Sequence, residues 1–236
     1  MSIDSERGNE GGHAGGSGVE FPEIHLVDRD ETTVRWLKRA CGTLPGVHVR
    51  CGDILDVEVD ALISPANSFG FMDGGIDAAY TRAFGPELQA RLQQRIHDVH
   101  GGELLVGAAE IVRTGGRAPS APWLIAAPTM RVPCILGKDS VAPYLATRAV
   151  LRLVLHGRLE DGKAVSGQVR SLAVPGLGTG VGRVPPQTAA RQIGRAIEEA
   201  RVPPAFPRSW WEASQRHQRL FADEVRDLQV EEGEEG

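Results

Sequence analysis

Two aspartates stand inside a glycine-rich stretch that directly follows a run of apolar residues. The stretch reads PANSFGFMDGGIDAAY, residues 65–80, and holds Asp73 and Asp77 on either side of the pair Gly74 and Gly75. Glycine allows positive φ and close backbone approach, so consecutive N–H groups at the start of a helix can converge on phosphate oxygens. The stretch therefore combines the chemistry of an anion cradle with carboxylates that an anion would repel.

A second glycine-rich turn occurs late in the chain. It reads PGLGTGVGRVP, residues 175–185, and it too follows an apolar run and precedes a helical pattern. Two such cradles suit a diphosphate, although glycines that simply form a tight turn are an equally good interpretation of either loop alone. The chain has no GxxxxGK[ST] motif and no acidic residue on a strand after the second turn, which disfavours a Walker-type ATP site and an ordinary Rossmann site.

The two aspartates of the first turn have structural alternatives. Asp73 stands where a helix N-cap would stand, and Asp77 falls in the first helical turn, where a carboxylate stabilises the helix dipole by about 0.3–1 kcal/mol. The structural role is the stronger interpretation for Asp73. Asp77 follows the double glycine, so beside a bound diphosphate its carboxylate must face something else, such as a sugar hydroxyl or a water.

Strands alternate with helices around both turns. Helical patterns cover residues 28–42, 75–102 (interrupted near Gly85 and Pro86), 140–157 and 186–200. Apolar or β-rich runs predict strands within residues 23–27, 47–53, 59–64, 107–116, 122–130 and 169–174. This alternation predicts an α/β sandwich with a mainly parallel sheet, in which 59–64 is a central strand and ligands bind outside the carboxyl ends of the strands.

Length and composition favour one folded domain with polar ends. A chain of 236 residues that is 41% hydrophobic can bury one substantial core, which we expect to span residues 21–221. The segments 1–20 and 222–236 carry net charges of −3 and −6, leave +4 on the middle, and are expected to be disordered tails. The chain has no long apolar run or apolar signal segment, so we expect a cytoplasmic protein that contacts no membrane.

The three cysteines support neither a disulfide framework nor a zinc site. Cys41, Cys51 and Cys134 are odd in number, widely spaced and without neighbouring histidine ligands. We expect free, mostly buried thiols. No motif demands a metal or a cofactor, so the expectation is a metal-independent protein, and a monomer.

Four stretches resemble, in order and spacing, the landmarks of the macro domain family. They are GDI at 52–54, DALISPANS at 60–68, GGIDAAYTRAFG at 74–85 and VPGLGTGVGRVP at 174–185. The resemblance covers about residues 52–200. It implies a three-layer α/β/α sandwich with a mixed, mainly parallel central sheet and a cleft for ADP-ribose across the strand ends. Many members hydrolyse ADP-ribose from modified groups.

The resemblance also implies roles for individual residues. Asp53 matches the aspartate that accepts a hydrogen bond from the adenine amino group, with Ile54 beside it supplying a backbone contact; a turn aspartate is the structural alternative. Asn67 matches the asparagine that hydrogen-bonds the distal ribose, with an Asx turn as its alternative. The two phosphate loops match Gly74, Gly75 and Ile76, and Gly178, Thr179, Gly180, Val181 and Gly182.

Asp77 matches the catalytic aspartate of the hydrolytic branch that is similar to the MacroD group, where it orients or activates a water near the distal ribose. General-base assistance of this kind contributes about 10²- to 10⁴-fold in rate. With Asn67 as its catalytic companion, the resemblance implies a mono-ADP-ribosyl hydrolase that acts on modified protein side chains, with modified nucleic acid as a further substrate class. Two alternatives stay open: a non-catalytic ADP-ribose reader, and an enzyme for a free ADP-ribose metabolite.

The sequence departs from the family pattern at several positions. Gly182 stands where members commonly carry an aromatic over the distal ribose, which predicts a more open cleft. Asp73 replaces a usual glycine, and Thr81 replaces a frequent histidine. The residue that stacks on the adenine is not identified, and packing roles are the alternative for each of its candidates. These candidates are Phe206, Trp210 and Trp211.

Overall fold

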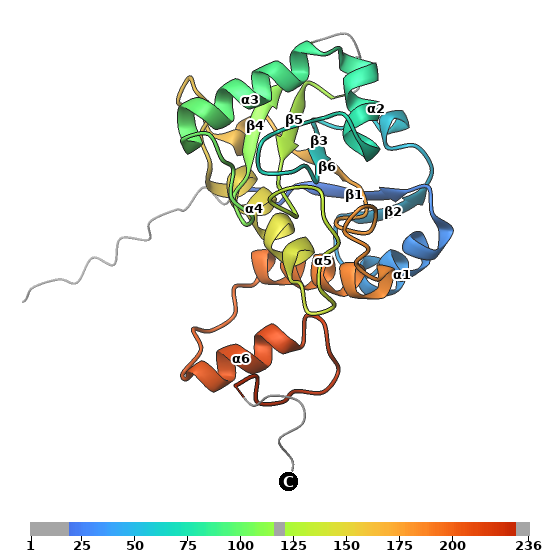
Figure 1. The fold of residues 1–236 in the computed structure, drawn as a ribbon, viewed down its shortest axis with the longest axis vertical. Helices are drawn as coiled ribbons and strands as arrows, with labels where there is room; N and C mark the ends of the chain where they lie inside the picture. Colours follow the sequence, from blue (N-terminus) through green and yellow to red (C-terminus); the bar gives the residue numbers. More distant parts are fainter. Residues whose placement is uncertain (1–18, 116–120, 230–236) are drawn as a thin grey trace, which may run out of the picture.

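A single six-stranded sheet forms the centre of the molecule in the computed structural model, which describes residues 19–115 and 121–229. The strands are β1 (Glu23–Asp28), β2 (Val47–Cys51), β3 (Ala61–Ser64), β4 (Glu110–Arg113), β5 (Trp123–Ala126) and β6 (Ser171–Val174). They lie in the order β2-β1-β6-β3-β5-β4, with all neighbours parallel except the antiparallel pair β4 and β5. The predicted mixed, mainly parallel sheet is confirmed (Figure 1).

Helices cover both faces of this sheet. The helices of the described chain are α1 (Glu31–Cys41), α2 (Gly75–Phe84), α3 (Glu87–His100), α4 (Ala142–His156), α5 (Pro186–Arg201) and α6 (Trp210–Gln218), with short 3₁₀ turns at Ile54–Asp56 and Val165–Gly167. Of these, α1 to α5 cover the sheet. Side chains of α1, α4 and α5 share one buried cluster with the sheet, and those of α2 and α3 share a second cluster on the other face. The result is the expected α/β/α arrangement of three layers.

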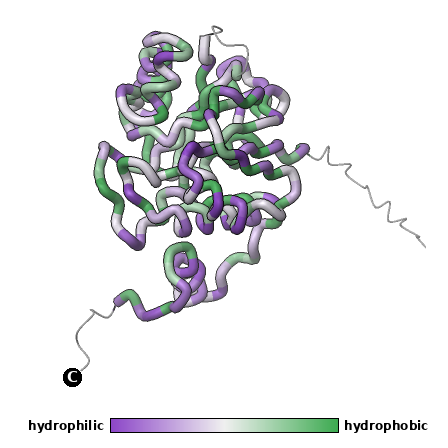
Figure 2. Tube along the Cα trace, turned by 90° about the vertical axis from the view of Figure 1, so that its right-hand side faces the viewer, coloured by the Kyte–Doolittle hydropathy of each residue, from purple (hydrophilic) through white to green (hydrophobic). Residues whose placement is uncertain are grey.

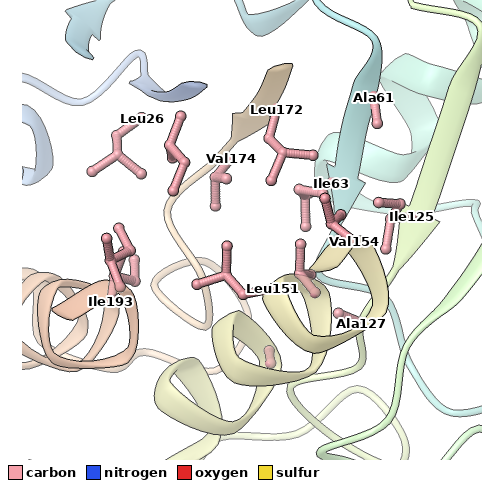
Figure 3. Close-up of a cluster of buried hydrophobic side chains, with 14 of the residues drawn as sticks. Leu26, Ala61, Ile63, Ile125, Ala127, Leu151, Val154, Leu172, Val174 and Ile193 are labelled. Atoms are coloured by element: carbon pink, nitrogen blue, oxygen red, sulfur yellow. The ribbon is translucent and has the colours of Figure 1, made fainter. Parts of the chain in front are cut away.

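The apolar runs of the sequence become strands that are buried on both faces. Every residue of β3 and β5 is buried, as expected for parallel strands between two helical layers. In Figure 3, Leu26 and Ile63 of the sheet face Leu151 of α4 and Ile193 of α5. In Figure 2 the hydrophobic residues concentrate along the interior of the body.

Local signals explain where the elements begin and break. Asp30 caps α1, because its carboxylate accepts a hydrogen bond of 2.8 Å from the Thr33 backbone N–H. The helical pattern after the first glycine-rich turn is interrupted where predicted: α2 ends at Gly85, whose φ is 95°, and α3 begins after Pro86.

The end of the chain differs from what the sequence pattern suggested. Helix α6 was not predicted, and it lies beneath α5, apart from the layers (Figure 1). An ion pair of 2.7 Å between Arg191 and Asp223 ties this part to α5. The described chain continues beyond residue 221, where Gln218 bonds the backbone of Arg226 at 2.7 Å. The predictions for residues 1–18 and 230–236 lie outside the described residues.

The structure tests the expectation for the cysteines. Cys41 is buried, and burial raises the pKa of its thiol to about 12, but Cys51 and Cys134 are exposed, so the expectation of mostly buried thiols is wrong. Both exposed cysteines lie in or beside loops at the carboxyl ends of strands, where the packed layers do not cover them. No helix in the described part of the chain is long and apolar enough to span a membrane.

The strand order brings the two glycine-rich loops together. Strand β6 lies between β1 and β3, and the three strands are parallel, so their carboxyl ends meet at one edge of the sheet. The first glycine-rich loop follows β3 and the second follows β6. Segments that are about 110 residues apart in the chain thus face each other across one edge.

Candidate functional site

A cleft of about 640 Å³ opens at this edge of the sheet, between the two glycine-rich loops. Strand β1 contributes Val27 and Asp28 to its wall, and helix α2 contributes Ala79 and Arg82. Every site residue predicted from the sequence also lines the cleft: Asp53, Ile54, Asn67, Gly74, Gly75, Ile76, Asp77, Gly178, Thr179, Gly180, Val181 and Gly182.

Asn67 organises the first loop from within. Its Nδ2 donates to the Phe71 carbonyl at 2.9 Å, and its Oδ1 accepts hydrogen bonds from the backbone N–H groups of Phe69 at 3.1 Å and Phe71 at 3.3 Å. The Asx-type contact considered as a structural alternative is therefore present. The second amide proton of Asn67 remains available to a ligand, because Nδ2 carries two.

Thr81 also serves the first loop. Its hydroxyl donates to the Met72 carbonyl at 2.8 Å, while the Met72 N–H bonds the Gln89 side chain at 2.7 Å. These bonds anchor the loop to helices α2 and α3. The threonine that replaces a family histidine is thus part of the scaffold of the loop.

The first loop ends in unpaired N–H groups at the start of α2. Gly74 is the N-cap and no side chain caps the helix, so the N-cap role favoured for Asp73 is wrong: Asp73 is exposed one position earlier. Gly75 adopts a φ of 55°, which favours glycine. Within the described residues, the backbone N–H groups of Gly75, Ile76 and Asp77 donate to no protein acceptor. The first N–H groups of a helix are a ready anion site.

The second loop presents another set of free N–H groups. Its shape is fixed by internal bonds that use carbonyl groups: Val184 N–H donates to Gly178 at 3.0 Å, and Arg183 N–H donates to Gly180 at 3.1 Å. In the part of the chain that the structure describes, no backbone N–H from residues 178 to 182 donates to a protein acceptor. Two donor-rich loops therefore face one cleft, which suits two linked phosphates.

The reason for the glycine at position 182 is packing. A Cβ built there would lie 2.6 Å from the Gly178 carbonyl oxygen and 2.9 Å from the Leu136 side chain. The Leu136 N–H also donates to the Gly182 carbonyl at 2.9 Å. Leu136, from the loop after β5, occupies the space beside Gly182, and the expectation of a more open cleft stays a prediction.

We expect Gly182→Ala to lower the free energy of unfolding by about 1–3 kcal/mol, the range for overpacking. The new methyl group would overlap the Gly178 carbonyl oxygen, and this backbone atom cannot shift without the rest of the loop. Gly180→Ala is the matched control, since a Cβ at 180 meets nothing within 4 Å. Urea denaturation measures both variants. Equal stability of the two would contradict the packing explanation.

Asp77 is a buried carboxylate at the wall of the cleft. Its side chain accepts a hydrogen bond of 2.6 Å from the hydroxyl of Ser64, the last residue of β3, and Asp77 is only 7% exposed. Burial raises the pKa of Asp77 to about 6, and the Ser64 bond opposes this rise. At neutral pH the carboxylate is ionised and one oxygen is held by Ser64.

Asp53 stands at another part of the wall, before the 3₁₀ turn Ile54–Asp56. Its carboxylate accepts from the Leu55 N–H at 3.0 Å and from the Arg29 guanidinium at 2.5 Å. The Leu55 bond, assisted by Arg29, lowers the pKa of Asp53, so it stays ionised and acts only as an acceptor. This suits recognition of an amino group.

The sequence did not identify every important residue of the cleft. Ser64 and Leu136 were missed, because their roles depend on contacts across the fold, and Arg29 and Arg82 were missed because neither belongs to a motif. None of the aromatic candidates for adenine stacking lines the cleft: Phe206, Trp210 and Trp211.

The described residues bring together no group of three or more His, Cys, Asp or Glu side chains that could hold a metal ion. The described lining of the cleft combines backbone donors with five aspartates and two arginines.

Comparisons with known proteins identify relatives of this chain in sequence and in fold. A protein of Aquifex aeolicus without an assigned activity is 32% identical over 155 residues, which are 66% of this chain and 81% of that protein. A Citrobacter rodentium protein named O-acetyl-ADP-ribose deacetylase is 30% identical over 185 residues, 75% of this chain and 96% of that protein. The macrodomain of Mycobacterium tuberculosis DarG shares the fold, with a TM-score of 0.51 at 22% identity over 64% of this chain and 88% of that one.

The family model described as Macro domain matches residues 63–193, more than half of the chain. This range contains both glycine-rich loops and Asp77. The chain is a member of the macro domain family.

Proposed function

We propose that this protein is a mono-ADP-ribosyl hydrolase, which binds ADP-ribose and releases it from modified protein side chains. The observation that carries the proposal is the buried carboxylate of Asp77 beside the first of two facing donor loops. A module that only bound a diphosphate would need the loops but would gain nothing from a negative charge next to them.

In this proposal the diphosphate lies between the two loops. The free N–H groups at the start of α2 bind one phosphate, and those of residues 178–182 bind the other. The carboxylate of Asp53 accepts a hydrogen bond from the adenine amino group at one end of the cleft. At the other end, the remaining amide proton of Asn67 donates to a hydroxyl of the distal ribose.

Asp77 then acts on water at the distal ribose. The ionised carboxylate takes a proton from a water molecule, whose oxygen bonds to the anomeric carbon while the bond from that carbon to the acceptor breaks. Asp77 then passes this proton to the leaving acceptor, which restores the carboxylate, and free ADP-ribose is the second product. A base with a pKa of about 6 suits this task, because it is ionised at neutral pH and still basic enough to take a proton.

A second candidate function is hydrolysis of a free metabolite. The relative named O-acetyl-ADP-ribose deacetylase aligns with 75% of this chain, and the same carboxylate would activate water for attack on an ester carbonyl. Both reactions release ADP-ribose and differ in the bond that is cleaved.

A substrate panel tests the proposal. Purified protein is incubated with carboxylate-linked, serine-linked and nucleobase-linked ADP-ribose conjugates and with O-acetyl-ADP-ribose, in ¹⁸O-labelled water. Release of ADP-ribose from a conjugate together with an acceptor that carries no ¹⁸O supports the proposed hydrolase. Labelled acetate identifies the deacetylase instead. Binding of ADP-ribose without turnover of any conjugate would identify a reader and overturn the enzymatic proposal.

We expect Ser64→Ala to shift the pH profile of turnover toward higher pH. Removing the hydroxyl removes the bond that favours the ionised form, so the pKa of Asp77 rises further and the rate falls below pH 6 more than above pH 8. Ser64→Thr, which keeps a hydroxyl, is the matched control. Steady-state kinetics from pH 5 to 9 give the profiles, and identical profiles for wild type and Ser64→Ala would refute this positioning role.

A further inference from the structure

Aromatic side chains are scarce among the described residues of the cleft wall. Among the described residues that line the cleft, Phe71 is the single aromatic, and it belongs to the first loop, where its backbone is held by Asn67. The other described lining residues are aliphatic, polar, acidic or basic. A purine needs a flat or apolar surface against its ring face, because hydrogen bonds to its edge leave the faces exposed to water.

Two arginines line the cleft. The guanidinium of Arg29 is engaged by Asp53 at 2.5 Å, although its side chain is 77% exposed. Arg82, on α2, is exposed and makes no hydrogen bond or ion pair with any described residue. Arg82 is therefore the cationic group of the cleft wall that is free to reorganise around a ligand.

The position of Arg82 on α2 separates it from the phosphate loop. Ile76, Ala79 and Arg82 follow one another at intervals of three residues and all line the cleft, so they form one face of the helix. Ile76 packs against the cluster that contains Ile54. Arg82 lies seven residues beyond Gly75, about 10 Å along the helix axis, which places it away from the N–H groups that start the helix.

We propose that Arg82 is the stacking partner of the ADP-ribose base, a role that rests on the proposed binding of ADP-ribose. A guanidinium is planar and weakly hydrated, and it stacks on aromatic rings more readily than an ammonium does. The base then lies with its amino edge toward Asp53 and its face against Arg82. Arg82 determines affinity for the base, while the two loops determine affinity for the diphosphate.

The test compares a ligand with a base and a ligand without one. Titration calorimetry with ADP-ribose and with ribose 5-diphosphate is performed on wild type, Arg82→Ala, Arg82→Lys and Arg82→Phe. Arg152→Ala is the matched control, because Arg152 is an exposed arginine on α4 that does not line the cleft. Thermal unfolding verifies that each variant is folded.

We expect Arg82→Ala to weaken ADP-ribose binding by about 2- to 30-fold, the range of a cation–π contact, and to leave ribose 5-diphosphate binding unchanged. Arg82→Phe should restore most of the loss, because it supplies a flat surface without a charge.

If wild type binds ADP-ribose and Arg82→Ala binds it equally well, the role of Arg82 is refuted while the proposed function stands. If Arg82→Lys binds like wild type and Arg82→Phe binds like Arg82→Ala, the contact is an ion pair and the stacking proposal is overturned. Absence of ADP-ribose binding by wild type would instead refute the proposed function.

Discussion

Asp77→Ala should lower the turnover of an ADP-ribosylated substrate by about 10²- to 10⁴-fold, the usual contribution of a general base. The same variant should bind ADP-ribose at least as tightly as wild type, because the loops that hold the diphosphate remain and a nearby negative charge is removed. The expected loss therefore falls on kcat. Single-turnover kinetics with saturating enzyme separate this effect from binding.

Asp73→Ala is the control for this experiment. Asp73 also lines the cleft, four residues earlier, but it is exposed and does not cap α2. We expect its turnover to stay within about threefold of wild type. Unchanged turnover in Asp77→Ala would refute the role of Asp77 as the base.

Asp77→Asn should make the protein more stable at neutral pH by as much as about 3 kcal/mol. The pKa of Asp77 is 3.8 in the unfolded chain and about 6 in the folded protein, because burial disfavours the charge. About two units of difference correspond to about 3 kcal/mol. An amide at this position keeps an acceptor for Ser64 and carries no charge to bury.

The sign of the effect depends on pH. Below about pH 3 the carboxyl is protonated in both states, so wild type and Asp77→Asn should be equally stable. As the pH rises from 4 to 6 the unfolded state ionises first, and the wild type loses stability relative to the variant; above pH 7 the difference is constant. Urea denaturation at about pH 3 and at pH 7.5 measures it. Asp73→Asn, an exposed control, should change stability by less than about 0.5 kcal/mol at both values. An Asp77→Asn variant that is less stable than wild type at pH 7.5 would contradict a buried, ionised Asp77.

Greater stability of Asp77→Asn at neutral pH would mean that the ionised Asp77 lowers the free energy of unfolding while it serves the proposed reaction. Burial of the Asp77 carboxylate destabilises the folded protein, and the hydrogen bond from Ser64 offsets part of this effect. The destabilisation that is left accompanies an ionised carboxylate, which the proposed reaction uses as its base. The Ser64→Ala and Asp77→Asn predictions therefore test the same hydrogen bond. The first variant removes its donor, and the second removes the charge of its acceptor.

Much of the fold was predictable because its signals are local. The apolar run of β3, the acid-to-base polarity and glycine stop of α1, and the break at Gly85 and Pro86 each depend on a few neighbouring residues. The alternation of such elements then restricts the topology to a mainly parallel sheet. Helix α6 was not predicted, because it follows a proline-rich segment and lacks a periodic apolar pattern. Its single buried residue is Gln218.

The walls of the site were predictable and their internal contacts were not. Glycine spacing identified both loops, and position after a strand placed Asn67 and Asp77 at the cleft. The partners of these side chains come from elsewhere: Ser64 reaches Asp77 across 13 positions of the chain, and Leu136 reaches Gly182 from another loop. Such pairs have no signature in one sequence, because they depend on how the strands are ordered in the sheet.

The most direct test of the central claim is titration calorimetry of the wild-type protein with ADP-ribose. Two loops of free N–H groups that face one cleft predict binding of one ADP-ribose per chain with a dissociation constant below about 100 μM, about −5.5 kcal/mol. Inorganic pyrophosphate should compete weakly for the same cleft. A titration that shows no binding at millimolar ADP-ribose would contradict the claim that the two loops hold its diphosphate.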